Sequence, residues 1–151
     1  MSALVYLDDI APGLRITNGP VIVSAAEIKA FATQFDPQPF HLDEEAAAGS
    51  FFGALSASGW QTAAIGMRLM VTAGPRLAGG YIGAGAELSW TQPVYAGDSL
   101  SLVAEIVEIK SSRSRPDRGI VTMRSELRNQ RGEVVYKLLA RMMVPRRPEP
   151  A

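Results

Sequence analysis

The chain contains no cysteine and only one histidine, His41. The absence of cysteine excludes disulfides, thiolate nucleophiles and cysteine-ligated zinc, and it fits a reducing compartment. We expect no metal site. Whatever proton chemistry the protein performs near neutral pH falls first to His41, because histidine is the side chain that titrates there.

The chain also lacks a net charge and a long apolar run. Fifteen basic residues balance fifteen acidic ones, so no overall field attracts it to nucleic acid or to an anionic membrane. No segment approaches the roughly 18 apolar residues of a membrane span. The first residues, MSALVYLDDIAPGL, lack the basic region and apolar run of a signal peptide. We therefore expect a soluble, cytoplasmic protein that binds neither nucleic acid nor membranes.

The length predicts a single domain. A chain of 151 residues buries roughly 70% of the surface that it exposes when unfolded, which suffices for one core without covalent staples. We predict one domain over residues 1–151, with an ordered core from about 11 to 144 and a flexible tail over 145–151.

Helical signals fill the first half of the chain. Ser24 and Glu27 form a capping box, and a helix follows that must end by Asp36, because Pro37 disfavours helical geometry in the residue before it. Asp43 precedes a second, short helix that Gly49 closes. A longer helix is predicted over 59–71, and because it is apolar nearly all round it should be buried on most sides.

Strand signals fill the second half. After a short extended lead at 14–17, apolar and polar residues alternate over 100–107, 121–128 and 134–142, with turn residues between these segments. Helices followed by consecutive antiparallel strands predict an α+β fold, in which a helix packs against one face of a sheet.

Asp36 and His41 are the candidate catalytic pair. Pro37 and Pro39 lie between them, so the segment is predicted to loop, and a loop of this length can bring a carboxylate and an imidazole to one water. Such a pair suits general acid–base catalysis. The spacing alone favours the alternative, a structural histidine in a turn.

A second charged feature is the basic stretch KSSRSRPDR at 110–118. It is typical of a solvated hairpin loop, and it could alternatively contact a phosphate-bearing ligand.

Two segments resemble a known family. FDPQPFHLDEEAAAGSFFGALSASGWQTAA is similar to the signature of the MaoC-like, (R)-specific enoyl-CoA hydratases, whose motif runs Asp-x-Asn-Pro-x-His-x-Asp before a glycine that opens a long helix. The motif falls on Asp36, Pro39, His41 and Asp43, and the glycine falls on Gly59. ELSWTQPVYAGDSL resembles a later strand and turn of the family, so the resemblance covers most of the chain, from about 11 to 144.

The resemblance implies a hotdog fold, in which an antiparallel sheet wraps around a long central helix, and usually a homodimer or a larger homo-oligomer. The implied enzyme is a hydro-lyase that adds water to a trans-2-enoyl-CoA or related acyl thioester. Asp36 and His41 would activate the water, and the Gly59 amide would act as the oxyanion donor. The absence of a side chain on Gly59 would let the thioester come close. No cofactor is implied, since coenzyme A is part of the substrate.

Some positions depart from the family pattern. Gln38 replaces the usual asparagine, which could loosen the turn, and Ser58 stands where many hydratases have histidine. We expect Phe40, Ser58, Trp60 and Met67 to contact substrate, whereas Asp43 is expected to cap a helix.

Two alternatives stay open. A hotdog acyl-CoA thioesterase is one, although the predicted helix over 59–71 lacks the acid that such enzymes usually carry there. A non-catalytic protein that binds acyl thioesters is the other.

Overall fold

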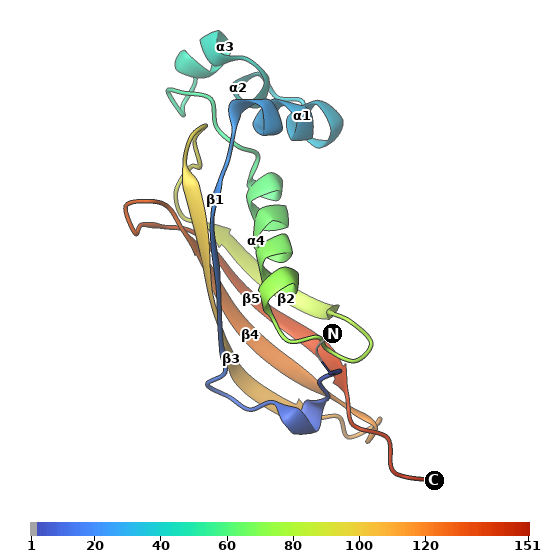
Figure 1. Cartoon of the computed structure of the whole chain (residues 1–151). Coiled ribbons are helices and arrows are strands. Elements are labelled where there is room, and N and C mark those ends of the chain that lie inside the picture. The colour runs from blue at the N-terminus through green and yellow to red at the C-terminus, as the bar shows by residue number, and fades with distance from the viewer. Residues whose placement is uncertain (1–2) are drawn as a thin grey trace.

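A five-stranded antiparallel sheet curves around one long helix in the computed structural model, which describes residues 3–151 (Figure 1). The helices are η1 (Leu7–Asp9), α1 (Ala25–Phe35), α2 (Pro39–Leu42), α3 (Glu44–Ala48) and α4 (Gly59–Ala73). The strands are β1 (Arg15–Ile22), β2 (Ile82–Trp90), β3 (Ser99–Ser111), β4 (Arg118–Arg128) and β5 (Val134–Pro145). This arrangement confirms the predicted α+β class and the hotdog architecture.

The strand order is β1-β3-β4-β5-β2, so β1 and β2 form the two edges of the sheet. The inward-facing positions of the three central strands meet across the sheet, as where Leu102 pairs with Leu127 and Leu127 with Tyr136. All three side chains are buried. The alternation in the sequence therefore placed the core face of these strands correctly, although each strand runs further than predicted.

Helix α4 lies across the inner face of the sheet. Gly66 permits close packing there, because a Cβ at this position would lie 3.3 Å from the Leu127 side chain. The expectation that α4 is buried on most sides is wrong. Trp60, Met67 and Val71 are 59%, 50% and 44% exposed, because no element of the described chain covers these side chains completely.

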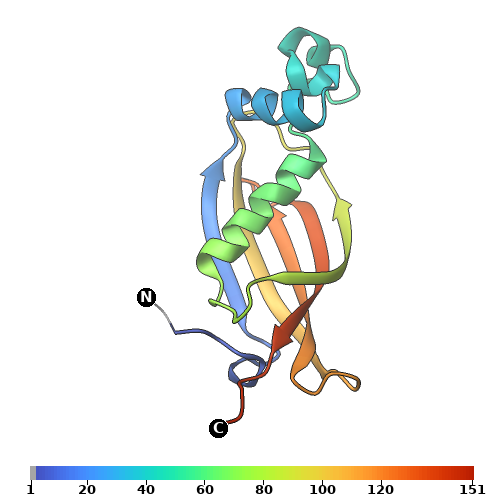
Figure 2. The same cartoon turned by 90° about the vertical axis from the view of Figure 1, so that its right-hand side faces the viewer.

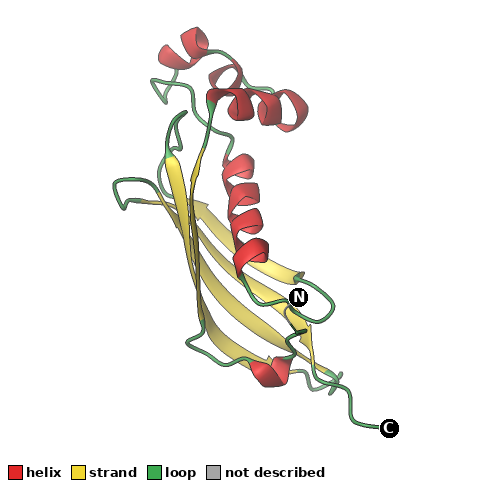
Figure 3. Cartoon of the chain, viewed as in Figure 1, coloured by secondary structure: helices red, strands yellow, loops and turns green. Residues whose placement is uncertain are grey.

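The short helices α1 to α3 gather at one end of the sheet, above the N-terminal end of α4 (Figures 2 and 3). The predicted caps are confirmed. The Ser24 hydroxyl accepts from the Glu27 amide at 3.1 Å, and the Asp43 carboxylate accepts from the Ala46 amide at 2.8 Å. The opposite end holds η1, the C-terminus and the β3–β4 hairpin with its basic stretch.

The segment after Asp36 is not the continuous loop that its prolines suggest. Pro39 opens the one-turn helix α2, which carries His41. Proline is compatible with the first helical position, because the amide there has no intrahelical acceptor and the fixed φ already suits a helix. The prediction of a non-helical segment holds for Pro37 and is wrong for 39–42.

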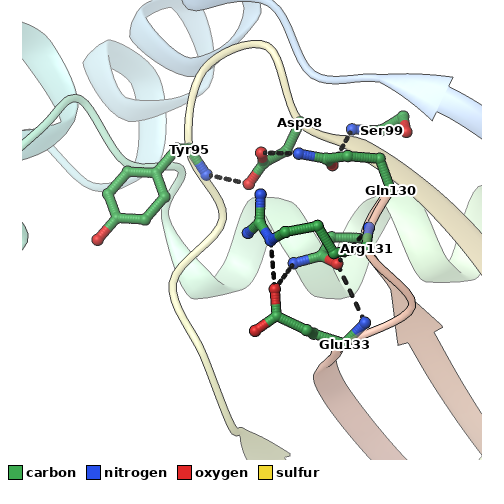
Figure 4. Close-up of polar contacts among 7 residues, drawn as sticks. Tyr95, Asp98, Ser99, Gln130, Arg131 and Glu133 are labelled. Atoms are coloured by element: carbon green, nitrogen blue, oxygen red, sulfur yellow. Dashed lines mark hydrogen bonds and ion pairs between the residues drawn. The ribbon is translucent and has the colours of Figure 1, made fainter.

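The loop over 93–98 binds the segment that connects α3 to α4. The Val94 carbonyl accepts a hydrogen bond from the Ala57 amide, and the Ala96 amide donates one to the Leu55 carbonyl. Asp98 holds the loop in shape. Its buried carboxylate accepts from the Tyr95 amide at 2.9 Å and from the Gln130 side chain at 2.8 Å (Figure 4).

The C-terminal segment is more anchored than expected. Strand β5 runs to Pro145, and beyond it the Arg146 guanidinium pairs with Asp8 at 3.0 Å while Arg147 pairs with Asp9. Within residues 3–151, no helix is both long and apolar enough to cross a membrane.

We predict that Asp98→Ala destabilises the fold, because it leaves the Tyr95 amide and the Gln130 side chain without their buried acceptor. Each unsatisfied donor costs about 1–3 kcal/mol. Asp98→Asn keeps one acceptor oxygen and should lose less. Urea unfolding of both variants measures the difference, and equal stabilities of Asp98→Ala and the wild type would contradict the role of this carboxylate.

Candidate active site

Asp36 and His41 come together at the base of a pocket. The Asp36 Oδ2 and His41 Nε2 atoms are 3.3 Å apart, and their side chains are only 19% and 6% exposed. Asp36 caps the C-terminal end of α1, where its amide donates to the Ala32 carbonyl, and His41 sits in α2. The structure thus brings together the two residues of the predicted pair across a turn of four residues.

A hydrogen bond at Nδ1, the ring nitrogen that does not face Asp36, fixes the orientation of the imidazole. His41 Nδ1 lies 2.6 Å from the Ser56 carbonyl oxygen. A carbonyl can only accept, so Nδ1 must carry the proton and donate. In the neutral ring this leaves the lone pair on Nε2, the atom that faces Asp36. Edge-on contact with the Phe40 ring, at 4.6 Å between centroids, further restrains the ring.

The Asp36 carboxylate is held by three groups. Burial by itself would raise its pKa, but the Gln38 side chain donates to it at 2.6 Å, the Ser58 hydroxyl also donates, and the imidazole lies alongside. The net effect is a pKa below the ordinary value for an aspartate, so Asp36 is an anion at neutral pH. The expectation that Gln38 could loosen this turn is wrong, since its amide ties the turn to the carboxylate.

Ser58 connects the carboxylate to the long helix. The residue is fully buried, and its hydroxyl accepts from the Trp60 amide at 3.2 Å as the N-cap of α4 while donating to Asp36. Gly59 is the first residue of this 15-residue helix. Its amide is one of the four at a helix N-terminus that lack an intrahelical acceptor, and the helix dipole makes this end attractive to developing negative charge.

The structure gives a reason, not visible in the sequence, why position 59 needs a glycine. A Cβ there would lie 2.5 Å from the Trp90 indole, and the Trp90 Nε1 donates to the Gly59 carbonyl at 2.7 Å. Trp90 therefore fills the position that a Cβ of residue 59 would take, while Gly59 still lines the pocket, and the approach of a thioester to its amide stays a prediction. The signal was a tryptophan in the family-like segment 87–100, but its partner lies 31 residues away in the sequence.

The pocket above these groups has a volume of about 500 Å³. Asp36, His41, Gly59 and two of the predicted substrate contacts, Phe40 and Trp60, line it. Gln38 also lines it, and residues that the sequence did not single out complete the lining: Phe51, Phe52, Ala57, Thr62, Trp90, Thr91, Gln92, Pro93 and Val94. One wall is a chain of aromatic contacts from Phe51 through Phe52 to Phe40.

The other predicted residues lie elsewhere. Ser58 is beneath the pocket, against Asp36. Met67 faces a separate apolar cavity of about 140 Å³ between α4 and the sheet, which shares no lining residue with the first. The basic stretch lies at the opposite end of the sheet, where Lys110 pairs with Glu108 and Arg118 with Asp117.

No set of three or more His, Cys, Asp or Glu side chains within residues 3–151 is placed to hold a metal ion. The chain itself supplies three groups to the chemistry of the pocket. These are an anionic carboxylate, an imidazole whose Nε2 faces that carboxylate, and a helix N-terminus.

Comparison with known proteins identifies relatives of both sequence and structure. A MaoC-like domain model matches residues 12–128. The crystal structure of a MaoC-like dehydratase from Rhodospirillum rubrum superposes with a TM-score of 0.91 at 56% identity, covering 96% of this chain and 99% of that one. The unliganded R-hydratase PhaJ1 from Pseudomonas aeruginosa superposes with a TM-score of 0.75 at 26% identity, covering 98% and 92%.

A shorter match relates the chain to a larger protein. Mesaconyl-CoA hydratase from Haloarcula marismortui is 42% identical over 74 residues, which cover 48% of this chain and only 20% of that protein. This match supports kinship in one segment and says nothing of the rest of the larger protein.

We predict that Ser58→Ala raises the pKa of Asp36, because it removes a hydrogen bond to the charged form. Since the lowered pKa contributes stability that is lost as the pH falls through it, the acid unfolding of this variant should begin at a higher pH. A ¹³C NMR titration of the carboxyl group measures the shift. Ser58→Thr keeps the hydroxyl and serves as the control, and identical titration of Ser58→Ala and wild type would contradict the assignment.

Proposed function

The chain belongs to the MaoC-like dehydratase family, and we propose that it is a hydro-lyase acting on an acyl thioester. The reaction is the reversible hydration of a trans-2-enoyl-CoA, or a related thioester, to the (R)-3-hydroxyacyl thioester. The observation that carries this proposal is the 3.3 Å approach of Asp36 and His41 in a pocket at the N-terminus of α4. Coenzyme A enters as part of the substrate.

The pair is arranged to hold one water molecule. The Nε2 lone pair and the Asp36 carboxylate are both hydrogen-bond acceptors, and a water has two hydrogens to donate to them. With both hydrogens engaged, the oxygen lone pairs are left for the substrate. As the oxygen attacks C3 of the enoyl group, one water proton passes to the pair, and the pair returns a proton to C2. The sum is one water added across the double bond.

The negative charge that develops during this attack needs a partner. It accumulates on the thioester oxygen, because C2, the carbonyl carbon and that oxygen share the enolate. The Gly59 amide is the proposed donor, since it opens a 15-residue helix and lines the pocket. One such donor is worth about 3–4 kcal/mol in other enzymes.

The remaining site residues divide by position. Phe40 and Trp60 line the pocket and are proposed to contact the acyl group. Ser58 acts on Asp36 rather than on substrate. A role for Met67 stays a prediction, as does the cytoplasmic location.

We predict that Asp36→Asn and His41→Ala each reduce turnover by about 10²–10⁴-fold, because each removes one of the two groups that hold the water during proton transfer. The measurement is loss of the conjugated absorbance of crotonyl-CoA and of longer trans-2-enoyl-CoAs.

Asp43→Asn is the matched control. It removes a carboxylate two residues from His41 yet keeps an oxygen to cap α3, so it should retain near wild-type turnover. Normal hydration by a folded Asp36→Asn or His41→Ala would contradict the proposal. Release of free thiol would indicate the thioesterase alternative, and binding without any reaction would indicate the non-catalytic one.

We also propose that two copies associate along β2. This strand is a nine-residue sheet edge, and exposed large side chains border it on α4 and on β2 itself. They are Trp60, Met67, Val71, Ile82 and Trp90. An unpaired edge next to an apolar face is suited to pairing with another strand, and a second copy supplies the same edge and face by symmetry.

Val71→Glu should shift the protein to monomers, because it puts a charge on that apolar face. Sedimentation velocity measures the change. Gln34→Glu adds the same charge to an exposed position of α1 and should leave the assembly intact. Wild-type protein that sediments as a monomer at micromolar concentration would rule out the proposed pairing.

A further inference from the structure

We infer that the pocket accepts uncharged acyl groups and discriminates against acyl groups that end in a carboxylate. This inference rests on the proposed function, since it names the substrate class that the same site takes. It is carried by the charges that line the pocket and by the partners those charges already have.

The lining contains one permanent charge, and it is negative. Among its fifteen residues, all within the described part of the chain, there is no lysine or arginine. The only acid is Asp36, which hydrogen bonds and the adjacent imidazole keep ionised. A ligand carboxylate in this pocket would therefore meet a like charge and no compensating one.

His41 does not change this balance. Its Nδ1 is engaged by the Ser56 carbonyl, and its Nε2 faces Asp36. Any positive charge on the imidazole is matched by that carboxylate at 3.3 Å. The site as a whole thus never presents a free cation to the acyl group.

A second acid, Glu133, lies next to the polar side of the pocket. The Gln92 side chain, which belongs to the lining, hydrogen-bonds to Glu133. Arg131 lies beside it but already forms an ion pair with Glu133. On the cap above, Lys29 is likewise paired, with Glu44 at 2.7 Å.

The other polar side chains of the lining already have partners, since Gln38 donates to Asp36 and the hydroxyls of Thr62 and Thr91 donate to backbone carbonyls. Most of the remaining lining is apolar. The Phe51–Phe52–Phe40 wall, the Trp60–Trp90 pair and Val94 offer no hydrogen-bond donor to a carboxylate, apart from the indole Nε1 of Trp60, since that of Trp90 is bound to Gly59. A charge that leaves water for such surroundings without a partner is strongly disfavoured. An alkyl or alkenyl chain gains from the same surroundings.

This separates the chain from one of its relatives. Mesaconyl, the acyl group named for the Haloarcula protein, is derived from a dicarboxylic acid and retains a carboxylate in the thioester. The 42% identity extends over only 74 residues and does not bring a cation into the pocket of this chain. We therefore expect enoyl groups with plain hydrocarbon tails as substrates.

The test compares two saturated thioesters that cannot be hydrated, glutaryl-CoA and the CoA thioester of monomethyl glutarate. They differ by one methyl group and one negative charge. Isothermal titration calorimetry of the full chain should show the neutral ester binding at least about tenfold more tightly, as expected for a like-charge contact in a partly buried site. In Asp36→Asn the difference should shrink several-fold, because the opposing charge is gone.

A cation at the pocket mouth supplies the second variant. Phe51 is 97% exposed and lines the pocket, so Phe51→Arg should also reduce the preference for the ester. Phe35→Arg makes the same change at a 64% exposed phenylalanine outside the lining, and it should leave the preference unchanged.

Equal binding of the two thioesters, tighter binding of glutaryl-CoA, or no binding of either would overturn the inference. Hydration of crotonyl-CoA is measured alongside. If crotonyl-CoA is not hydrated while the preference for the ester and its loss in Asp36→Asn are observed, the proposed reaction fails and the charge selection stands.

Discussion

The hydrogen bond from His41 Nδ1 to the Ser56 carbonyl is the contact on which the site depends, because it joins the two parts of the molecule that must meet. His41 belongs to α2, one of the three short helices at the end of the sheet, while Ser56 belongs to the extended segment that leads into α4. That segment is itself bound to the loop over 93–98, through the Ala57–Val94 and Ala96–Leu55 backbone hydrogen bonds. The imidazole is therefore positioned relative to the sheet and not only relative to Asp36. The same hydrogen bonds set its distance from the N-terminus of α4.

Local signals were enough to predict most of the helices and the three central strands of this fold. The caps at Ser24 and Asp43 rest on side chains and amides three residues apart, and strand alternation reflects one buried face, so both can be read from neighbouring residues. The same holds for Asp36 and His41, which are close in the sequence. Helix α2 was missed because a proline was taken only as a helix breaker, whereas at the first position it is compatible with a helix.

Contacts between distant segments could not be predicted in this way. Nothing in the residues around Gly59 indicates that Trp90 fills the space beside it, and nothing around Asp36 indicates that Ser58 donates to it. The exposed side of α4 was mispredicted for a related reason. An apolar helix surface indicates that something covers it but not whether the cover belongs to the same chain. In this chain, the two departures at Gln38 and Ser58 prove to be donors to one carboxylate, so both positions keep the ionised form of Asp36 in place.

The contacts of Asp36 also assign different roles to Asp36 and His41 in the proposed reaction. A carboxylate stabilised as an anion by Gln38, Ser58 and the imidazole is a poor proton acceptor, because protonation would break or weaken each of these contacts. The imidazole has one nitrogen committed to the Ser56 carbonyl and one facing the pocket. It can therefore take a proton at Nε2 and return it without changing its orientation. In this arrangement His41 moves the proton, while Asp36 orients the water and balances the charge that the ring carries between the two transfers.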